Sequence, residues 1–112
     1  MERIQRVNQL LKKELSRIIF KQLDLPKDVL TTVTRVETAP NLIQVRVYIS
    51  VLPEEQSKLV LQGLNRNIYG IQQQLNKRLN MRPIPKIIFI KEEQTIEAGR
   101  VEELLDKIQK ND

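Results

Sequence analysis

The side chains of this chain that could carry out recognition chemistry are mostly cations, and many of them lie in one stretch. Residues 62–91 contain six Lys or Arg and no Asp or Glu. Guanidinium and ammonium groups without nearby acids are the groups with which proteins neutralise phosphates. The stretch predicts a surface that binds a polyanion, and a merely solvated cationic surface is the alternative.

The middle of this basic stretch holds Tyr69-Gly70, where two apolar helical patterns meet. Leu61 and Leu64 precede the pair and Ile71 and Leu75 follow it, at helical spacing. Glycine weakens helix continuity, so we expect two short helices hinged at this pair. The free amides at the start of the second helix, flanked by arginine, would then form a seat for phosphate.

The side chains that are missing exclude several classes of site. The chain has no Cys and no His, so it can form no disulfide, zinc-thiolate site, thiol nucleophile or imidazole base. Carboxylates, lysines, hydroxyls and two tyrosines remain, but no arrangement of them indicates acid/base catalysis or a metal site. We therefore expect a protein that is not an enzyme and has no cofactor, metal or small-molecule substrate.

The net charge of +5 is distributed in blocks along the chain. Lys and Arg against Asp and Glu number six against two in residues 1–21, four against five in 22–61 and three against seven in 92–112. Separated blocks favour a field directed at a polyanion over a general solubility effect. We expect the cations of residues 1–21 and 62–91 to share one function, and the acidic end to be a solubilising segment.

The length and composition indicate one small globular domain. The chain has 112 residues, of which 40% are hydrophobic and 29% charged, enough for a single core. No apolar run approaches the ~20 residues that cross a bilayer, and the N-terminus lacks a signal-peptide block. We expect a cytoplasmic monomer that has no contact with a membrane.

Periodicity predicts seven elements along the chain. Helical spacing covers about residues 2–23, and strand patterns cover 30–38 and 43–51. One helix runs from 53 to about 67, a second runs from there to 80, and a strand covers 86–90. A last helical stripe consists of Val101, Leu104, Leu105 and Ile108. The turn at 39–41 joins the first two strands as an antiparallel hairpin. The strand at 86–90 is apolar on both faces, which favours a central position in the sheet.

This order predicts an α+β fold in two layers, with a three-stranded sheet covered by helices on one face. The order α-β-β-α-(kink)-α-β-α matches the KH domain of the bacterial type, type II. An ordinary KH domain carries a Gly-X-X-Gly loop at its hinge. Gly63 and Gly70 are too far apart in this chain to form that loop.

A more specific resemblance rests on residues along nearly the whole chain. They are Arg3-Ile4-Gln5-Arg6-Val7, Glu14-Leu15, Asn41-Leu42, the run Val45 to Leu52, Leu64, Gly70, Leu75, Leu79, Arg82, Pro85, Phe89, Gly99, Val101 and Leu104-Leu105. In these positions the chain resembles the ribosome-binding factor A family of bacterial small-subunit maturation factors. The resemblance implies a KH-like fold whose hinge carries an Ala-X-Gly kink.

Three positions depart from the pattern of that family. Ile68 takes the place of the kink alanine, Leu25-Pro26-Lys27 stands where the family tends to have Asp-Pro-Arg, and Gln72 stands where an arginine is usual. A bulky Ile68 should change the crossing of the two hinge helices or be accommodated by smaller neighbours. The departures concern the contacts to phosphate more than the fold.

The resemblance implies a non-catalytic factor that binds the small (30S) ribosomal subunit or its 16S rRNA precursor. Such a factor assists rRNA processing, late subunit maturation and cold adaptation. The residues that we expect to contact RNA are Arg3, Arg6, Lys13, Arg66, Tyr69, Gly70, Lys77, Arg78, Arg82 and Lys86. Tyr48 could stack on a base or pack flat against a helix.

The whole chain, residues 1–112, is expected to form one KH-like ribosome-binding domain, in which 93–112 is an acidic C-terminal helical extension. With 4% aromatic residues, contacts should be mostly to RNA backbone and shape. The alternative is a protein-interaction adaptor of the same fold, whose basic surface binds an acidic protein.

Overall fold

The computed structural model describes residues 3–22, 25–82 and 84–93. Its elements are α1 (Arg3–Gln22), β1 (Leu30–Thr38), β2 (Gln44–Leu52), the 3₁₀ helix η1 (Glu54–Gln56), α2 (Ser57–Arg66), α3 (Ile68–Arg78) and β3 (Lys86–Lys91). The expected order of the first six helices and strands is confirmed. The expected last helix, with the stripe from Val101 to Ile108, and all of the acidic extension after Glu93 lie outside the described residues.

The sheet has the order β1-β2-β3, with β1 antiparallel and β3 parallel to β2. The hairpin expected from the sequence is therefore confirmed. The expectation that residues 86–90 form a central strand is wrong, because β1 already occupies one side of β2 and the crossover through α2 and α3 brings β3 to the other. Ile88 is 36% exposed, since one face of this edge strand carries no helix.

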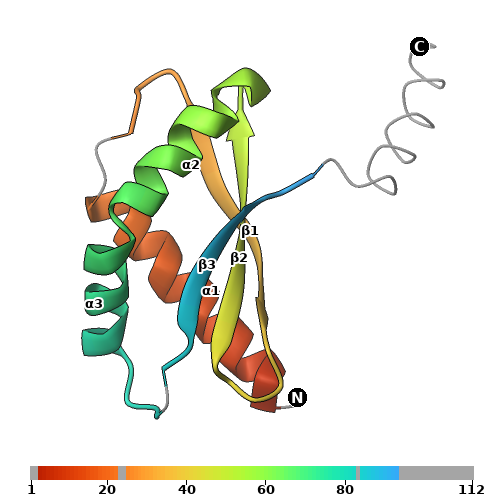
Figure 1. The fold of residues 1–112 in the computed structure, drawn as a ribbon, viewed down its shortest axis with the longest axis vertical. Coiled ribbons are helices and arrows are strands. Elements are labelled where there is room, and N and C mark those ends of the chain that lie inside the picture. The colour runs from red at the N-terminus through yellow and green to blue at the C-terminus, as the bar shows by residue number, and fades with distance from the viewer. Residues whose placement is uncertain (1–2, 23–24, 83, 94–112) are drawn as a thin grey trace, which may run out of the picture.

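The helices lie on one face of the sheet (Figure 1). Residues of β2 alternate between this buried face and the open face: Val45, Val47 and Ile49 are fully buried while Gln44 and Arg46 are exposed. Apolar side chains of all three helices complete the core, which consists of Leu11, Leu15, Ile18, Ile19, Val33, Val36, Val45, Val47, Ile49, Val51, Val60, Leu64, Ile71, Leu75, Leu79, Ile87 and Phe89. This packing fixes the relative positions of α1, α3 and β3.

The break between the two middle helices lies at Asn67. This residue leaves the helical region with φ −102° and ψ 11° and caps α2 through its side-chain amide, which donates to the carbonyl of Gly63 at 2.7 Å. Gly70 lies in the first turn of α3, and a side chain there would meet no atom within 4 Å. The expected end of the first of these helices at about residue 67 is thus confirmed, whereas the hinge lies two to three residues before Tyr69-Gly70, because an amide cap at Asn67 ends α2 before the glycine is reached.

The open face of the sheet carries a network of neutralised charges. The Arg35 guanidinium lies 3.8 Å from the centre of the Tyr48 ring, Arg35 and Arg46 pair with Glu37, and Glu37 accepts a hydrogen bond from the Tyr48 hydroxyl at 3.2 Å. Tyr48 therefore neither packs against a helix nor presents a free ring to a base, the two roles that its sequence position allows. Its ring is covered by a cation.

Glu92 joins the same network from the end of β3. Its carboxylate accepts hydrogen bonds from the Thr34 hydroxyl at 2.7 Å and from Arg35 Nε at 3.0 Å. Partial burial acts to raise the pKa of Glu92, but the hydrogen bonds from Thr34 and Arg35 outweigh it and hold the pKa below its ordinary value. The hydrogen bond between Arg35 and Glu92 also raises the pKa of Arg35.

Candidate nucleic-acid interface

A groove of about 560 Å³ lies between α3 and the chain that enters β3. Its lining residues come from two segments: Ile68, Tyr69, Gln72 and Asn76 from α3, and Arg82, Ile84, Lys86 and Ile87 from the chain before and at the start of β3. The partly buried Ile68 and Ile84 give it an apolar surface, and the two cations add positive charge. Such a combination suits a planar base with an attached phosphate.

The side-chain amide of Gln72 fixes one wall of this groove to the other. Gln72 Nε2 donates to the carbonyl of Pro85 at 3.1 Å, and Gln72 Oε1 accepts from the backbone N–H of Ile87 at 3.0 Å. The two bonds satisfy one backbone group in β3 and one just before it, on the side of the strand away from β2. We call this pair of hydrogen bonds the Gln72 clamp. It holds Lys86, which lies between the two bonded residues, at the edge of the groove.

Three of the residues predicted from the sequence line this groove. Tyr69 is 74% exposed, Arg82 and Lys86 are exposed, and no acid of the described residues pairs with either cation. Arg82 Nη1 donates to the adjacent carbonyl of Met81 at 2.8 Å. Both cations keep donors that are free for an anion.

Arg78 has a different environment from the other predicted cations. Its guanidinium lies 3.4 Å from the Glu14 carboxylate, whose side chain is only 13% exposed. Glu14 also lies 4.0 Å from Arg17 on its own helix. This half-buried acid links α1 to α3 and takes up part of the charge of Arg78, so Arg78 has less to offer to RNA than an unpaired arginine.

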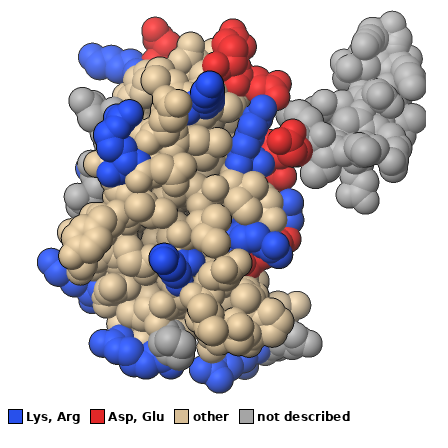
Figure 2. Space-filling model, viewed as in Figure 1, with Lys and Arg blue, Asp and Glu red and all other residues tan. Residues whose placement is uncertain are grey.

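The remaining predicted residues lie on neighbouring surfaces and do not line the groove. Arg3, Arg6 and Lys13 are exposed on α1, Arg66 is exposed in the last turn of α2, and Gly70 and Lys77 are exposed on α3. In Figure 2, Lys and Arg are spread over the face that is shown and predominate along its left side and lower end, whereas Asp and Glu lie mainly at the top and along the right edge.

Two residues outside the predicted set act on the predicted ones, since Gln72 joins the walls of the groove and Glu14 pairs with Arg78. Gln72 appeared only as a departure from a family pattern, and no local signal could show that its amide faces Pro85 and Ile87. Glu14 appeared only as part of a resemblance. Both act through partners that are 13 to 64 residues away in the sequence, which no local pattern reveals.

Other classes of site find no support in the described part of the chain. Residues 3–22, 25–82 and 84–93 contain no group of three His, Cys, Asp or Glu that could hold a metal ion. Among the helices that the structure describes, none is long and apolar enough to cross a membrane.

The fold and the groove define an α+β, KH-like protein with the exposed cations Arg82 and Lys86 beside α3. Comparison with known proteins agrees with this class. The chain is similar to solved structures of ribosome-binding factor A from Thermus thermophilus (TM-score 0.68, 25% identity, 79% of this chain and 93% of that chain) and to a homology model of the same factor fitted into a cryo-EM map of a 30S complex (TM-score 0.62, 27% identity, 74% and 88%).

Sequence comparison shows which family of this class the chain belongs to. The family model described as "Ribosome-binding factor A" matches residues 3–105. Relatives of that name include those of Thermodesulfovibrio yellowstonii, 36% identical over 97% of this chain and 92% of the relative, and Lachnoclostridium phytofermentans, 40% identical over 84% and 70%. This chain belongs to the ribosome-binding factor A family.

Proposed function

We propose that this protein is a non-catalytic assembly factor that binds the 30S ribosomal subunit or its 16S rRNA precursor and assists late maturation. The observation that carries the proposal is the family match over residues 3–105. A structural relative, the Thermus thermophilus factor, has been fitted into the map of a 30S complex. The exposed cations of α1, α3 and the start of β3 support the proposal, since binding to RNA uses cations that neutralise phosphates.

The α3/β3 groove supports a specific way of binding. Ile68 and Ile84, which are partly buried, offer an apolar surface for one unpaired base, and Arg82 and Lys86 stand where they can neutralise its phosphates. The open face of the sheet is less suited to RNA, since Arg35 and Arg46 are already paired with Glu37. RNA should therefore approach from the helix side, along α3 and α1.

The extent of the domain, its cellular location and its fold class are part of the same proposal. We infer that residues 1–112 act as one cytoplasmic ribosome-binding domain with 93–112 as its acidic extension, and that the fold is a two-layer type II KH domain. The mixed sheet, the leading helix α1 and the helical pair before β3 support this class. The break at Asn67 takes the place of the glycine loop.

A salt titration of binding to purified 30S subunits tests the proposal. Counterion release predicts that log K falls steeply and linearly with log salt concentration, by about 0.7–0.9 per neutralised phosphate. The double variant Arg82→Ala/Lys86→Ala should bind more weakly and lose about 1.4–1.8 from this slope. A matched double variant, Lys27→Ala/Lys58→Ala, removes the same charge from exposed residues outside the groove.

Three results would contradict parts of this scheme. A flat salt dependence would favour the adaptor alternative, in which an acidic protein is the partner. Equal losses in the two double variants would mean that total charge matters and the groove does not. Full binding by a folded Arg82→Ala/Lys86→Ala variant would move the site to α1 or elsewhere.

A further inference from the structure

The side-chain amides of Gln72 and Asn76 form a hydrogen-bonded row on α3, along the α3/β3 groove. The orientation of the Gln72 amide is fixed, because the N–H of Ile87 can only donate and the carbonyl of Pro85 can only accept. Its oxygen therefore faces Ile87 and its nitrogen faces Pro85. The second N–H of Gln72 Nε2 is then directed at Asn76, whose Oδ1 lies 3.2 Å away.

The orientation of Gln72 decides which atom Asn76 presents to the groove. Because Asn76 Oδ1 accepts the hydrogen bond from Gln72, the amide nitrogen Nδ2 must lie on the other side of the Asn76 amide group. Asn76 is exposed and lines the groove. Among the residues that the structure describes, none accepts a hydrogen bond from Nδ2. Two N–H donors of Asn76 are therefore left for a ligand.

The other polar side chains that line the groove are also mainly donors. Arg82 and Lys86 have no acceptor. The side-chain oxygens of Gln72 and Asn76 already accept hydrogen bonds. The Tyr69 hydroxyl is the group of this lining that can both donate and accept. A ligand whose polar edge carries acceptors therefore fits the groove, whereas an amino group would meet other N–H groups.

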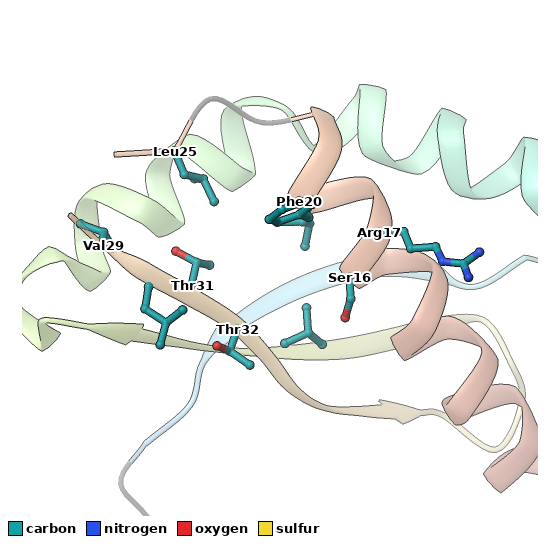
Figure 3. A pocket seen from close by; sticks show the side chains of 10 residues that line it. Ser16, Arg17, Phe20, Leu25, Val29, Thr31 and Thr32 are labelled. Atoms are coloured by element: carbon teal, nitrogen blue, oxygen red, sulfur yellow. The ribbon is translucent and has the colours of Figure 1, made fainter. Parts of the chain in front are cut away.

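A second groove, of about 660 Å³ between α1 and the start of β1, has no such bias (Figure 3). In the described part of the chain its polar lining consists of Arg17 and the hydroxyls of Ser16, Thr31 and Thr32. Hydroxyls both donate and accept, so they accommodate amino and carbonyl groups alike. Selection between bases by hydrogen bonds is therefore expected at the α3/β3 groove and not at this one.

Guanine is the base whose edge matches such a row of donors. Its N7 and O6 are two adjacent acceptors, whereas adenine has an amino group in place of O6, and cytosine also presents an amino group. Uracil has a single acceptor, O4, on the same edge. Unpaired bases of single-stranded RNA expose this edge to proteins. The partly buried Ile68 and Ile84 supply the apolar surface on which the ring of such a base can lie.

We propose that the α3/β3 groove selects guanine at an unpaired position of an RNA, and that Asn76 is the residue that recognises the base. Asn76 Nδ2 donates to the O6 or N7 acceptor of guanine, while Arg82 or Lys86 neutralises the neighbouring phosphate. This inference rests on the proposed function, because it takes the ligand of the groove to be RNA. It adds the identity of the base and the side chain that distinguishes it.

Titration of the isotope-labelled full chain with four short RNAs, followed by two-dimensional NMR, tests the proposal. Each RNA is a heptanucleotide of cytidines with one test base in the middle: guanine, hypoxanthine, adenine or 2-aminopurine. The first two bases share O6, and the last two lack it. We expect the first two RNAs to bind at least about fivefold more tightly, the low end for a base contact because Asn76 is exposed to water. The side-chain amide signals of Asn76 should shift on binding.

Two substitutions of asparagine by aspartate separate recognition of the base from charge. Asn76→Asp keeps an oxygen for Gln72 and replaces the free amide nitrogen by an oxygen of similar size, so the ratio of guanine to adenine affinity should fall to about one or below. Asn80→Asp is the matched control, since Asn80 is exposed and does not line the groove. It adds the same charge, so it should weaken both RNAs equally and leave the ratio unchanged. The NMR spectrum of each variant shows whether the domain is folded.

Four results would overturn guanine recognition. They are equal affinities for the four RNAs, a uracil RNA that binds as tightly as the guanine RNA, a guanine preference that persists in Asn76→Asp, and no binding of any of these RNAs. Binding of the parent chain to 30S subunits is measured separately. Normal 30S binding without a base preference would remove guanine recognition alone. A clear guanine preference without 30S binding would remove the ribosomal role and leave the base site standing.

Discussion

Replacing Gln72 by Ala removes the amide that joins α3 to β3, and the structure allows the cost to be worked out. Ile87 is 2% exposed, so its N–H loses its acceptor in a place that water reaches poorly. An N–H left without a partner costs about 1–3 kcal/mol, and the lost bond to Pro85 contributes about 0.5–1.5 kcal/mol. We expect the free energy of unfolding to fall by about 2–4 kcal/mol.

The assay is urea unfolding followed by circular dichroism, with amide hydrogen exchange as a local readout. A loss of this size should lower Tm by roughly 8 °C or more in a domain of this length. The exchange of the Ile87 amide should accelerate more than that of Ile49 in the central strand. Gln73→Ala is the matched control, since Gln73 is the exposed neighbour on the same helix and should change stability by less than about 0.5 kcal/mol.

A second substitution separates the two bonds of the clamp. Arginine has donors but no acceptor, so Gln72→Arg can still donate to Pro85 but leaves the Ile87 N–H without a partner. We expect its stability to lie between those of Gln72→Ala and the parent. The reasoning is refuted if Gln72→Ala and Gln73→Ala are equally stable and the exchange of Ile87 is unchanged.

Three further predictions concern the turn, the open face and the core. Leu42 has φ 62°, where glycine is favoured, so Leu42→Gly should be more stable than Leu42→Ala by about 1 kcal/mol in urea unfolding, and the reverse order would contradict this. The pKa of Glu92 is lowered by Thr34 and Arg35 despite burial, so the stability that Glu92 adds over Glu92→Gln should be complete above about pH 4.3 and lost as pH falls through the lower folded pKa. A pH series of unfolding measures it, and a constant difference down to pH 2 would argue against the network. Leu75 is fully buried, so Leu75→Ala should cost about 2–5 kcal/mol by the same assay, and a cost below 1 kcal/mol would place Leu75 outside the core.

The sequence by itself determined the local elements of this protein. The strand expected over residues 30–38 is β1 (Leu30–Thr38) as the structure has it, because Thr and Val in an extended segment and a following turn are local signals. The long first helix was equally clear from its spacing. The charge blocks were also a property of the sequence, and of the acidic one the structure describes only Glu92 and Glu93.

Only the tertiary structure decided where these elements and side chains meet. The position of β3 at the edge depends on which side of β2 the crossover reaches, and an apolar pattern cannot show this. Tyr48 lies under Arg35 because of a cross-strand register, and the helix break lies at Asn67 because of an amide cap. The groove that gathers Tyr69, Arg82 and Lys86 depends on the Gln72 clamp, a contact between residues far apart in the chain that local spacing does not encode.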